Sequence, residues 1–236
     1  MEVHHHSHGH SSKSWKNYIW EFVMLFLAVF CGSMAEYWLE HKIEKDREKQ
    51  YITSLVADLK IDSTNVSLSI TEFESSAKHF DTINKYIQHI QDSYNPTLLF
   101  SLKRIIGYRD FIPTDKTLQQ LKNAGNLRLI RNVEVTDSIA NYDLQLKKFQ
   151  ITSGELQTQF NKIFEDYQSL IYLEYKDSTA LKTKYLITKD DAAFKKYHNH
   201  IKLFKRLKDL YVMRLQELKI NTKNLLALLK KEYKIS

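Results

Sequence analysis

Apolar residues are distributed along this 236-residue chain in two different ways. Residues 19–39 read IWEFVMLFLAVFCGSMAEYWL and form the longest apolar run in the sequence. Beyond it, apolar side chains return every seven residues between charged ones, as in amphipathic helices that share a core. The pattern predicts an all-α protein, in which an N-terminal transmembrane helix continues into an elongated antiparallel helical bundle of coiled-coil-like character.

Residues 15–39 are predicted to be a transmembrane anchor. A helix rises about 1.5 Å per residue, so the stretch from Trp20 to Trp38 covers roughly 27 Å, close to the thickness of a bilayer hydrocarbon core. Aromatic rings with a polar edge suit the depth of lipid headgroups. We therefore expect membrane-interface positions at Trp15, Tyr18 and Trp20 on one side, and at Tyr37 and Trp38 on the other.

Other interpretations of this segment stay open. The uninterrupted apolar part, residues 22–35, is short enough for a buried soluble helix or a signal-peptide core. A cleaved signal has a basic start and a small-residue cleavage site, whereas Glu21 stands at the head of the apolar run. A lipoprotein signal would acylate Cys31, but Phe30 occupies the place where such signals have a small residue. The paired aromatic residues favour a true membrane span.

Small residues predict a surface for helix association within the span. Ala28, Gly32 and Glu36 lie on one helical face, and Cys31 and Ala35 lie beside it. Small side chains at four-residue spacing let two membrane helices approach closely. We therefore expect self-association through Ala28, Gly32 and Ala35.

The orientation of the anchor is weakly encoded. Two lysines precede the span and four basic residues follow it, which by the positive-inside rule places the C-terminal domain in the cytoplasm. However, acidic residues are interleaved among those four, and long domains are exported despite their charge. An uncleaved anchor with a short N-terminal tail commonly leaves that tail inside. We favour a single-pass protein of the bacterial inner (cytoplasmic) membrane with a periplasmic domain.

Three long amphipathic helices are predicted after the anchor, at about residues 40–94, 132–176 and 189–234. The apolar stripe of the first consists of Ile52, Leu59, Val66, Phe73, Phe80 and Ile87. The stripe of the second consists of Val135, Tyr142, Phe149, Leu156, Ile163 and Leu170. The stripe of the third consists of Tyr197, Phe204, Tyr211, Leu218 and Leu225. One stripe alone stabilises a helix poorly, so we expect residues 40–236 to bury the three together.

Residues 96–131 are predicted to form irregular short helices, near 97–107 and 115–123. Gly107, Pro113 and Gly125 interrupt the helical pattern there, and Thr114 is a candidate N-cap for the second piece. The segment either supplies a broken fourth helix or covers the distal end of the bundle.

Composition narrows the possible functions. Only five glycines and two prolines are present, which disfavours all-β and α/β folds, and a single cysteine excludes a disulfide framework. The net charge is +7, and residues 176–236 hold 16 basic against 6 acidic residues. Such a basic segment suits anionic lipid, nucleic acid or an acidic partner, but it also fits a solvated lysine-rich helix face. Exposed stacking platforms are not evident, so nucleic acid is the least favoured of these partners.

Residues 1–14 are predicted to be a disordered, histidine-rich tail. Imidazoles at this density bind zinc, copper or nickel loosely, and the candidate ligands are His4, His5, His6, His8 and His10. No second set of ligands fixes a coordination geometry. An artificial tag is the alternative, although the histidines are interrupted by other residues.

The sequence contains no recognisable catalytic motif. A glycine-rich phosphate loop, HExxH and Gly-x-Ser-x-Gly are absent, and His198 and His200 point to different faces of a helix. We therefore predict no enzymatic activity, no cofactor and no small-molecule substrate.

Two stretches and the C-terminus carry a family resemblance. They are WKNYIWEFVMLFLAVFCGSMAEYWLEHKIEKDREKQYI (15–52), LQQLKNAGNLRLIRNVEV (118–135) and LLALLKKEY (225–233). With these residues the chain resembles a family of uncharacterised single-pass membrane proteins of Bacteroidota, a domain of unknown function. The resemblance implies the anchor and the helical domain, and no catalytic residue. In its most specific soluble part, Gly125 permits a left-handed or tight backbone, and Arg128 and Arg131 are candidates to contact an anion or partner.

These observations favour a membrane-anchored, non-enzymatic interaction or scaffold protein, a subunit of a bacterial envelope complex. Its expected partners are the lipid bilayer and either a protein partner or a second copy of the chain. Two alternatives stay open: a single-pass sensor that binds a ligand in its helical bundle, and a basic protein that binds anionic lipid or nucleic acid.

Overall fold

The computed structural model describes residues 15–106, 110–172 and 185–235. The described residues are 86% helical, and no β-strand occurs in these ranges apart from one isolated bridge between Ile171 and Leu186. The prediction of an all-α protein is therefore confirmed. The chain divides into two compact units, Met1–Lys49 and Gln50–Ser236.

The first unit contains one described element, the beginning of helix α1 (Trp15–Ser75). No described residue of this unit is buried. Large apolar side chains are exposed all round the helix, among them Phe22, Leu25, Val29 and Met34. Since an all-apolar helix is stable only where something other than water surrounds it, this surface requires a lipid or protein environment.

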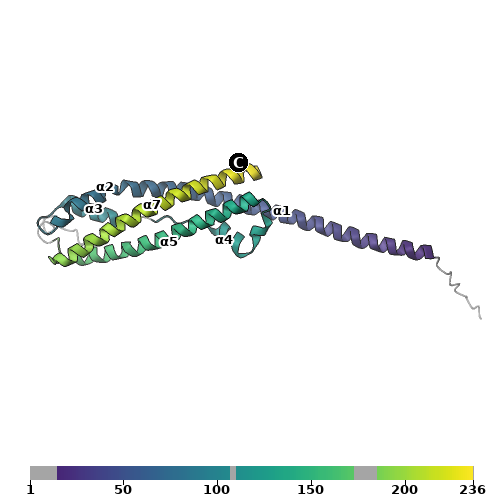
Figure 1. Cartoon of the computed structure of the whole chain (residues 1–236), viewed down its shortest axis with the longest axis horizontal. Helices are drawn as coiled ribbons and strands as arrows, with labels where there is room; N and C mark the ends of the chain where they lie inside the picture. The colour runs from purple at the N-terminus through teal and green to yellow at the C-terminus, as the bar shows by residue number, and fades with distance from the viewer. Residues whose placement is uncertain (1–14, 107–109, 173–184, 236) are drawn as a thin grey trace, which may run out of the picture. The chain divides into compact units, whose positions relative to one another are not determined.

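The second unit is built from the remaining helices (Figure 1). After the end of α1 they are α2 (Ala77–Tyr86), the 3₁₀ turn η1 (Ile87–His89), α3 (Pro96–Ile106), α4 (Lys116–Asn123), the 3₁₀ turn η2 (Asn126–Leu129), α5 (Val133–Leu170) and α7 (Asp191–Tyr233). The side chains of Asn132 and Asp190 cap α5 and α7 by accepting the N–H groups of Val135 and Ala192.

The core of this unit is formed by the three predicted apolar stripes. No residue in any of them is more than 3% exposed. Burying each such side chain contributes roughly 1.5–3 kcal/mol relative to leaving it in water. The heptad spacing in the sequence thus identified the faces on which these helices pack.

Helices α5 and α7 lie side by side and antiparallel (Figure 1). Asn132 near the start of α5 bonds Glu232 near the end of α7, whereas Gln159 near the end of α5 bonds His200 near the start of α7. Helices α1 and α2 also run antiparallel to α7. The ring of Phe73 lies 4.7 Å from that of Tyr211, and the ring of Phe80, later in the chain, lies 6.0 Å from that of the earlier Phe204.

The irregular segment forms a broken fourth helix of the bundle. As the segment proceeds along the sequence, the residues of α2 and α1 that it contacts come progressively earlier in the sequence. In chain order, the hydrogen-bonded pairs are Ser101 with His79, Thr114 with Asp62, Thr117 with Asp58 and Asn126 with Tyr51. Of the two arrangements left open by the sequence, a distal cover and a broken helix, the contacts support the second.

The first long helix differs from the expected continuous helix over 40–94, because it breaks at Ser76. The hydroxyls of Ser75 and Ser76 donate to the carbonyl oxygens of Glu72 and Phe73, each at 2.7 Å. Serine side chains that bond the preceding turn compete with the backbone ladder and bend helices. The apolar stripe continues through the break, which is why the periodicity did not reveal it.

Candidate functional site

The residues predicted to meet the membrane interfaces all lie on α1 in the first unit and are all exposed: Trp15, Tyr18, Trp20, Tyr37 and Trp38. Among the described residues, one helix is long and apolar enough to cross a membrane, and none of its most apolar 18-residue window is buried. The chain thus carries a candidate membrane span.

The predicted association surface is also open. Ala28, Gly32 and Ala35 are exposed on α1, and a Cβ added at Gly32 would have no atom within 4 Å. Nothing in the first unit therefore occupies the space that a second helix would need at Gly32.

The histidines of the N-terminal tail, His4, His5, His6, His8 and His10, lie outside the described residues. Within the described ranges, no group of three or more His, Cys, Asp or Glu side chains is placed to hold a metal ion. Metal binding by the tail stays a prediction.

The turn between α4 and α5 contains the two arginines proposed to contact an anion or partner. Gly125 has φ 65° and precedes η2, so the left-handed conformation expected of this glycine is confirmed. Arg128 and Arg131 are both exposed on either side of the buried Leu129 and Ile130. The turn presents two guanidinium groups at the surface.

A different site lies at the break between α1 and α2. A cavity of about 440 Å³, which we call the Ser76 cavity, opens beside this residue. Its wall combines apolar rings with ionisable groups from four helices, and its lining includes Glu72, Lys78, His79, Arg104, Phe204 and Lys208. All of these residues belong to the second unit.

Lys208 is the central polar residue of the Ser76 cavity. It projects from α7 with only 5% of its surface exposed, and its Nζ donates a hydrogen bond to Oγ of Ser76. The ammonium also lies 4.7 Å from the ring centroid of Phe80 and 5.7 Å from that of Phe73, within the range of cation–π attraction. No carboxylate in the described ranges lies within ion-pairing distance of it.

Electrostatics in the Ser76 cavity favour negative charge. Burial lowers the pKa of Lys208 to about 8; its neighbour Lys205 also lowers it, and Asp209 opposes both. The pKa of His79 is lowered as well, first by burial and then by the positive charges of Lys78, Arg104 and Lys208. Since the same cations disfavour a protonated imidazole at this position, they would attract an anion there.

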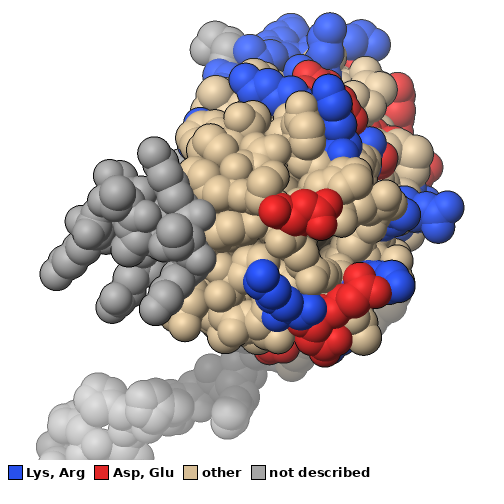
Figure 2. All heavy atoms as spheres, turned by 90° about the vertical axis from the view of Figure 1, so that its left-hand side faces the viewer, with Lys and Arg blue, Asp and Glu red and all other residues tan. Residues whose placement is uncertain are grey.

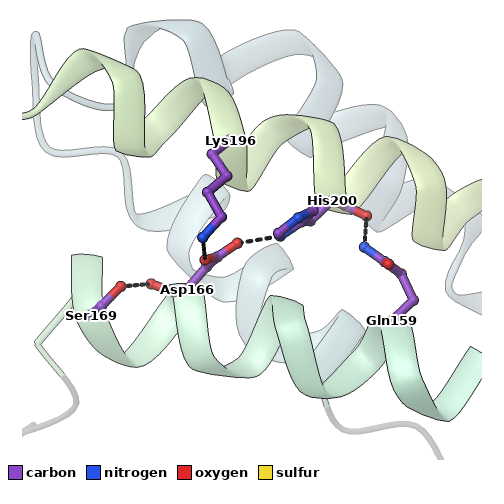
Figure 3. A network of polar contacts seen from close by, with 5 residues as sticks. All are labelled: Gln159, Asp166, Ser169, Lys196 and His200. Atoms are coloured by element: carbon purple, nitrogen blue, oxygen red, sulfur yellow. Dashed lines mark hydrogen bonds and ion pairs between the residues drawn. The ribbon is translucent and has the colours of Figure 1, made fainter.

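A second polar cluster connects α5 and α7 (Figure 3). Nδ1 of His200 donates to Oδ2 of Asp166 at 2.6 Å, and Nζ of Lys196 lies 3.7 Å from Oδ1 of the same carboxylate. Gln159 donates to the backbone carbonyl of His200 at 3.1 Å. The Ser169 hydroxyl bonds the backbone oxygen of Asp166, not its carboxylate, so no nucleophile completes a catalytic triad among the residues of this cluster. The cluster joins two helices at their polar edge.

On the face shown in Figure 2, basic side chains are most numerous along the upper edge, acidic side chains lie among them, and wide areas are uncharged. Several lysines of the basic C-terminal segment have acidic neighbours. Lys195 pairs with Asp191 at 2.7 Å, and Lys205 lies 3.7 Å from Asp81 of α2. These contacts agree with the interpretation of the segment as a solvated helix face.

The sequence did contain a signal for the residues that were missed. Lys208 stands four residues after Phe204 and three before Tyr211, at a position where the stripe calls for an apolar side chain. Asp62 stands three residues after Leu59 and four before Val66 in the same way. A charged residue at a core position of a heptad pattern is the feature that identifies both.

The chain matches no protein-family model, no curated protein and no solved structure. The resemblance to the Bacteroidota family therefore rests on the three quoted stretches and stays a prediction.

Proposed function

We propose that this chain is a membrane-anchored, non-enzymatic interaction or scaffold protein. In this proposal α1 enters the bacterial inner membrane once, and the helical domain from Gln50 onward lies in the periplasm as a subunit of an envelope complex. The observation that carries the proposal is the exposed apolar surface of α1, which no other described part of the chain covers.

The composition of that surface supports lipid as the surrounding medium. Phe22, Phe26 and Phe30 follow one another along the helix, with neighbouring rings stacked at 6.4 and 6.0 Å. Ionisable side chains are confined to the ends of the apolar stretch, where Glu21 and Glu36 can reach headgroup water. The flanking tryptophans and tyrosines have the composition of an interfacial belt.

Extraction of membranes tests the anchor. Full-length protein is expected to remain with the membrane pellet in alkaline carbonate and to require detergent for release. A variant in which Leu25, Val29 and Phe30 are replaced by lysine should appear in the soluble fraction, because charges at the centre of a span are costly. Release of the unaltered protein by carbonate alone would remove the basis of the proposal.

Self-association is the second part of the proposal. Helix association in lipid depends on close approach of backbones at small residues. Cross-linking of the protein in neutral nanodiscs is expected to capture a dimer or a co-purified partner. Gly32→Ile should abolish a dimer that forms through this surface, whereas Val23→Ile, which enlarges a side chain on the opposite side of the helix, should not. A protein that stays monomeric and free of partners under cross-linking contradicts this part.

The side of the membrane is tested separately. With Cys31 replaced by serine, single cysteines are introduced by Ser14→Cys before the span and Ser54→Cys after it. A membrane-impermeant maleimide applied to intact cells whose outer membrane has been made permeable should label the second cysteine and not the first. The opposite labelling would place the domain in the cytoplasm and eliminate the envelope-facing role, while leaving the anchor intact.

A further inference from the structure

The Ser76 cavity is the one place in the described bundle where a buried cation faces an opening lined by other cations. We propose that this cavity binds a small organic phosphate, whose phosphate oxygens meet Lys208 at the floor and Lys78 and Arg104 at the rim. The proposed site lies entirely within residues 50–236, so it does not depend on the membrane anchor or on the scaffold role.

Lys208 has hydrogen-bonding capacity that the described protein does not use. An ammonium carries three donors, and one of them is directed to Oγ of Ser76. Ser76 can accept this bond because its own hydrogen is donated to the carbonyl oxygen of Phe73 at 2.7 Å. A buried charge is costly unless it is paired and fully hydrogen-bonded. Phosphate oxygens in the cavity would supply both the missing charge and the missing acceptors.

The rim of the cavity adds charge of the same sign. Lys78 from α2 and Arg104 from α3 are exposed there, and Glu72 from α1 is the one acidic side chain among the lining residues. With Lys208 protonated, the cavity has an excess of two positive charges, which suits a phosphomonoester dianion better than a carboxylate. A guanidinium also matches the geometry of a phosphate, because it donates two parallel hydrogen bonds.

The size and the apolar part of the wall define the rest of the ligand. A volume of about 440 Å³ lies within the usual range of ligand pockets, roughly 300–1,000 Å³. The side chains of Phe80, Ile105 and Phe204 contribute an apolar wall. Inorganic phosphate would leave this part unfilled, whereas an organic body attached to the phosphate would cover it.

A purely structural role for Lys208 makes a different prediction. The ammonium could serve only to hold Ser76 and the two phenylalanine rings at the helix break. Replacing it would then change the stability of the bundle, and added organic phosphates would have no saturable effect. Direct measurement of binding separates the two roles, because it does not depend on stability.

The experiment uses the full-length protein in neutral phosphatidylcholine nanodiscs, with phenyl phosphate as the probe. Isothermal titration near pH 7 should show saturable binding, and benzyl alcohol, which has the ring without the phosphate, should show none. Lys208→Met should weaken the affinity by at least about tenfold, since a charge-assisted hydrogen bond is worth 1.4 kcal/mol or more. Lys219→Met removes an exposed charge from the same helix and should leave the affinity within about twofold of the unaltered protein.

Two further variants keep the test decisive if Lys208→Met does not fold. Arg104→Gln and Lys78→Gln alter exposed side chains at the rim, so they should preserve the fold and weaken phenyl phosphate binding severalfold. Absence of binding to the folded, unaltered protein would overturn the proposal, as would equal binding by Lys208→Met or by benzyl alcohol. A phosphomonoester is also the headgroup of phosphatidic acid. If nanodiscs containing that lipid abolish the response to phenyl phosphate, the phosphate comes from lipid; an unchanged response identifies a soluble ligand.

Discussion

The phenolic hydroxyl of Tyr142 donates a 3.0 Å hydrogen bond to Oδ2 of Asp62, a carboxylate on α1 that is completely buried. The second oxygen of this carboxylate accepts the backbone N–H of Thr114 at 2.8 Å. One acid thus joins α1, α5 and the connection that precedes α4. Burial is the main cause of the raised pKa of Asp62, and it also raises the pKa of Tyr142 well above its usual range.

Removing this acid should destabilise the bundle. Asp62→Ala leaves the N–H of Thr114 and the hydroxyl of Tyr142 without an acceptor, and we expect it to lower the free energy of unfolding by roughly 2–4 kcal/mol. Asp62→Asn retains an oxygen that accepts the N–H of Thr114, and its amide N–H can donate to the phenolic oxygen of Tyr142. The loss of unfolding free energy should therefore be smaller than for Asp62→Ala. Urea unfolding of the full-length protein in detergent, followed by circular dichroism, measures both. Equal losses for the two variants would show that the hydrogen bonds contribute little.

The acid dependence of stability should change in the same variants. Because the pKa of Asp62 in the folded state lies above 3.8, the proton favours folding. The corresponding stabilisation is fully present below pH 3.8 and is lost as pH rises through the folded-state pKa. Asp62→Asn cannot lose that proton. Its stability relative to the unaltered protein should therefore increase across this window, and a constant difference would contradict the assignment.

Asp58 should act as a cap for α4, although it belongs to another helix. Its Oδ2 accepts both the backbone N–H and the hydroxyl of Thr117, at 3.2 and 2.5 Å, whereas the N-cap residue Asp115 makes no capping bond with its side chain. We expect Asp58→Ala to lower the free energy of unfolding by about 2 kcal/mol. The matched control, Asp115→Ala, should cost less than half as much in the same denaturation assay.

The helix starts show where sequence reasoning reached its limit. Thr114 was the candidate N-cap by residue type and position, but the N-cap of α4 is Asp115. The side chains that bond this turn come from Asp58 and Asp62, more than fifty residues earlier. A local motif cannot reveal a cap supplied by a neighbouring helix. The core was predictable for the opposite reason, since seven-residue spacing depends only on which side of each helix faces its neighbours.

Polar residues at positions where the heptad pattern predicts apolar ones mark polar contacts that the apolar stripes do not reveal. Ser153 stands four residues after Phe149, an offset at which Leu146 and Phe160 are the apolar neighbours of Tyr142 and Leu156. Its hydroxyl donates to Asp110 at 2.5 Å. The other oxygen of Asp110 accepts the hydroxyl of Tyr211, also at 2.5 Å, and Tyr211 in turn accepts the N–H of Phe111 at 3.0 Å. The broken fourth helix is therefore held where the stripe fails. The candidate phosphate site also lies at such an irregularity, because Lys208 stands between Phe204 and Tyr211 of the third stripe, at a position where an apolar side chain is expected.

Asp166 should stabilise the pairing of α5 with α7 mainly through His200. The side chain of Asp166 is 14% exposed and that of Lys196 is 66% exposed, so water screens the lysine much more strongly. We expect Asp166→Ala to lower the free energy of unfolding by roughly 1–2 kcal/mol and Lys196→Ala by less than about 0.5 kcal/mol. Chemical denaturation at low and high salt tests both values. A Lys196→Ala loss as large as that of Asp166→Ala would contradict this order.

Lys208 should make the bundle more stable as the solution becomes alkaline. Its pKa is about 8 in the folded protein against 10.5 for an ordinary lysine, so between these values the unfolded chain binds more protons than the folded one. Stability attributable to this residue therefore rises from pH 8 to 10.5, by up to about 3 kcal/mol at roughly 1.4 kcal/mol per pKa unit. The ionisable groups around it are Glu72, Lys78, His79, Arg104, Lys205 and Asp209.

Comparison with Lys208→Met isolates this contribution, because every other titrating group is common to both proteins. The difference in unfolding free energy, variant minus unaltered protein, should be largest near pH 7, where the unaltered protein must hold a buried charge, and should shrink toward pH 10.5. Lys219→Met should show no such trend, since that lysine is exposed. Saturating phenyl phosphate should stabilise the unaltered protein near pH 7, because it pairs with the ammonium of Lys208. The difference in unfolding free energy between variant and unaltered protein should therefore become smaller when the ligand is present. A difference that stays constant with pH would mean that the ammonium of Lys208 is solvated in solution, and the phosphate site would then lose its buried cation.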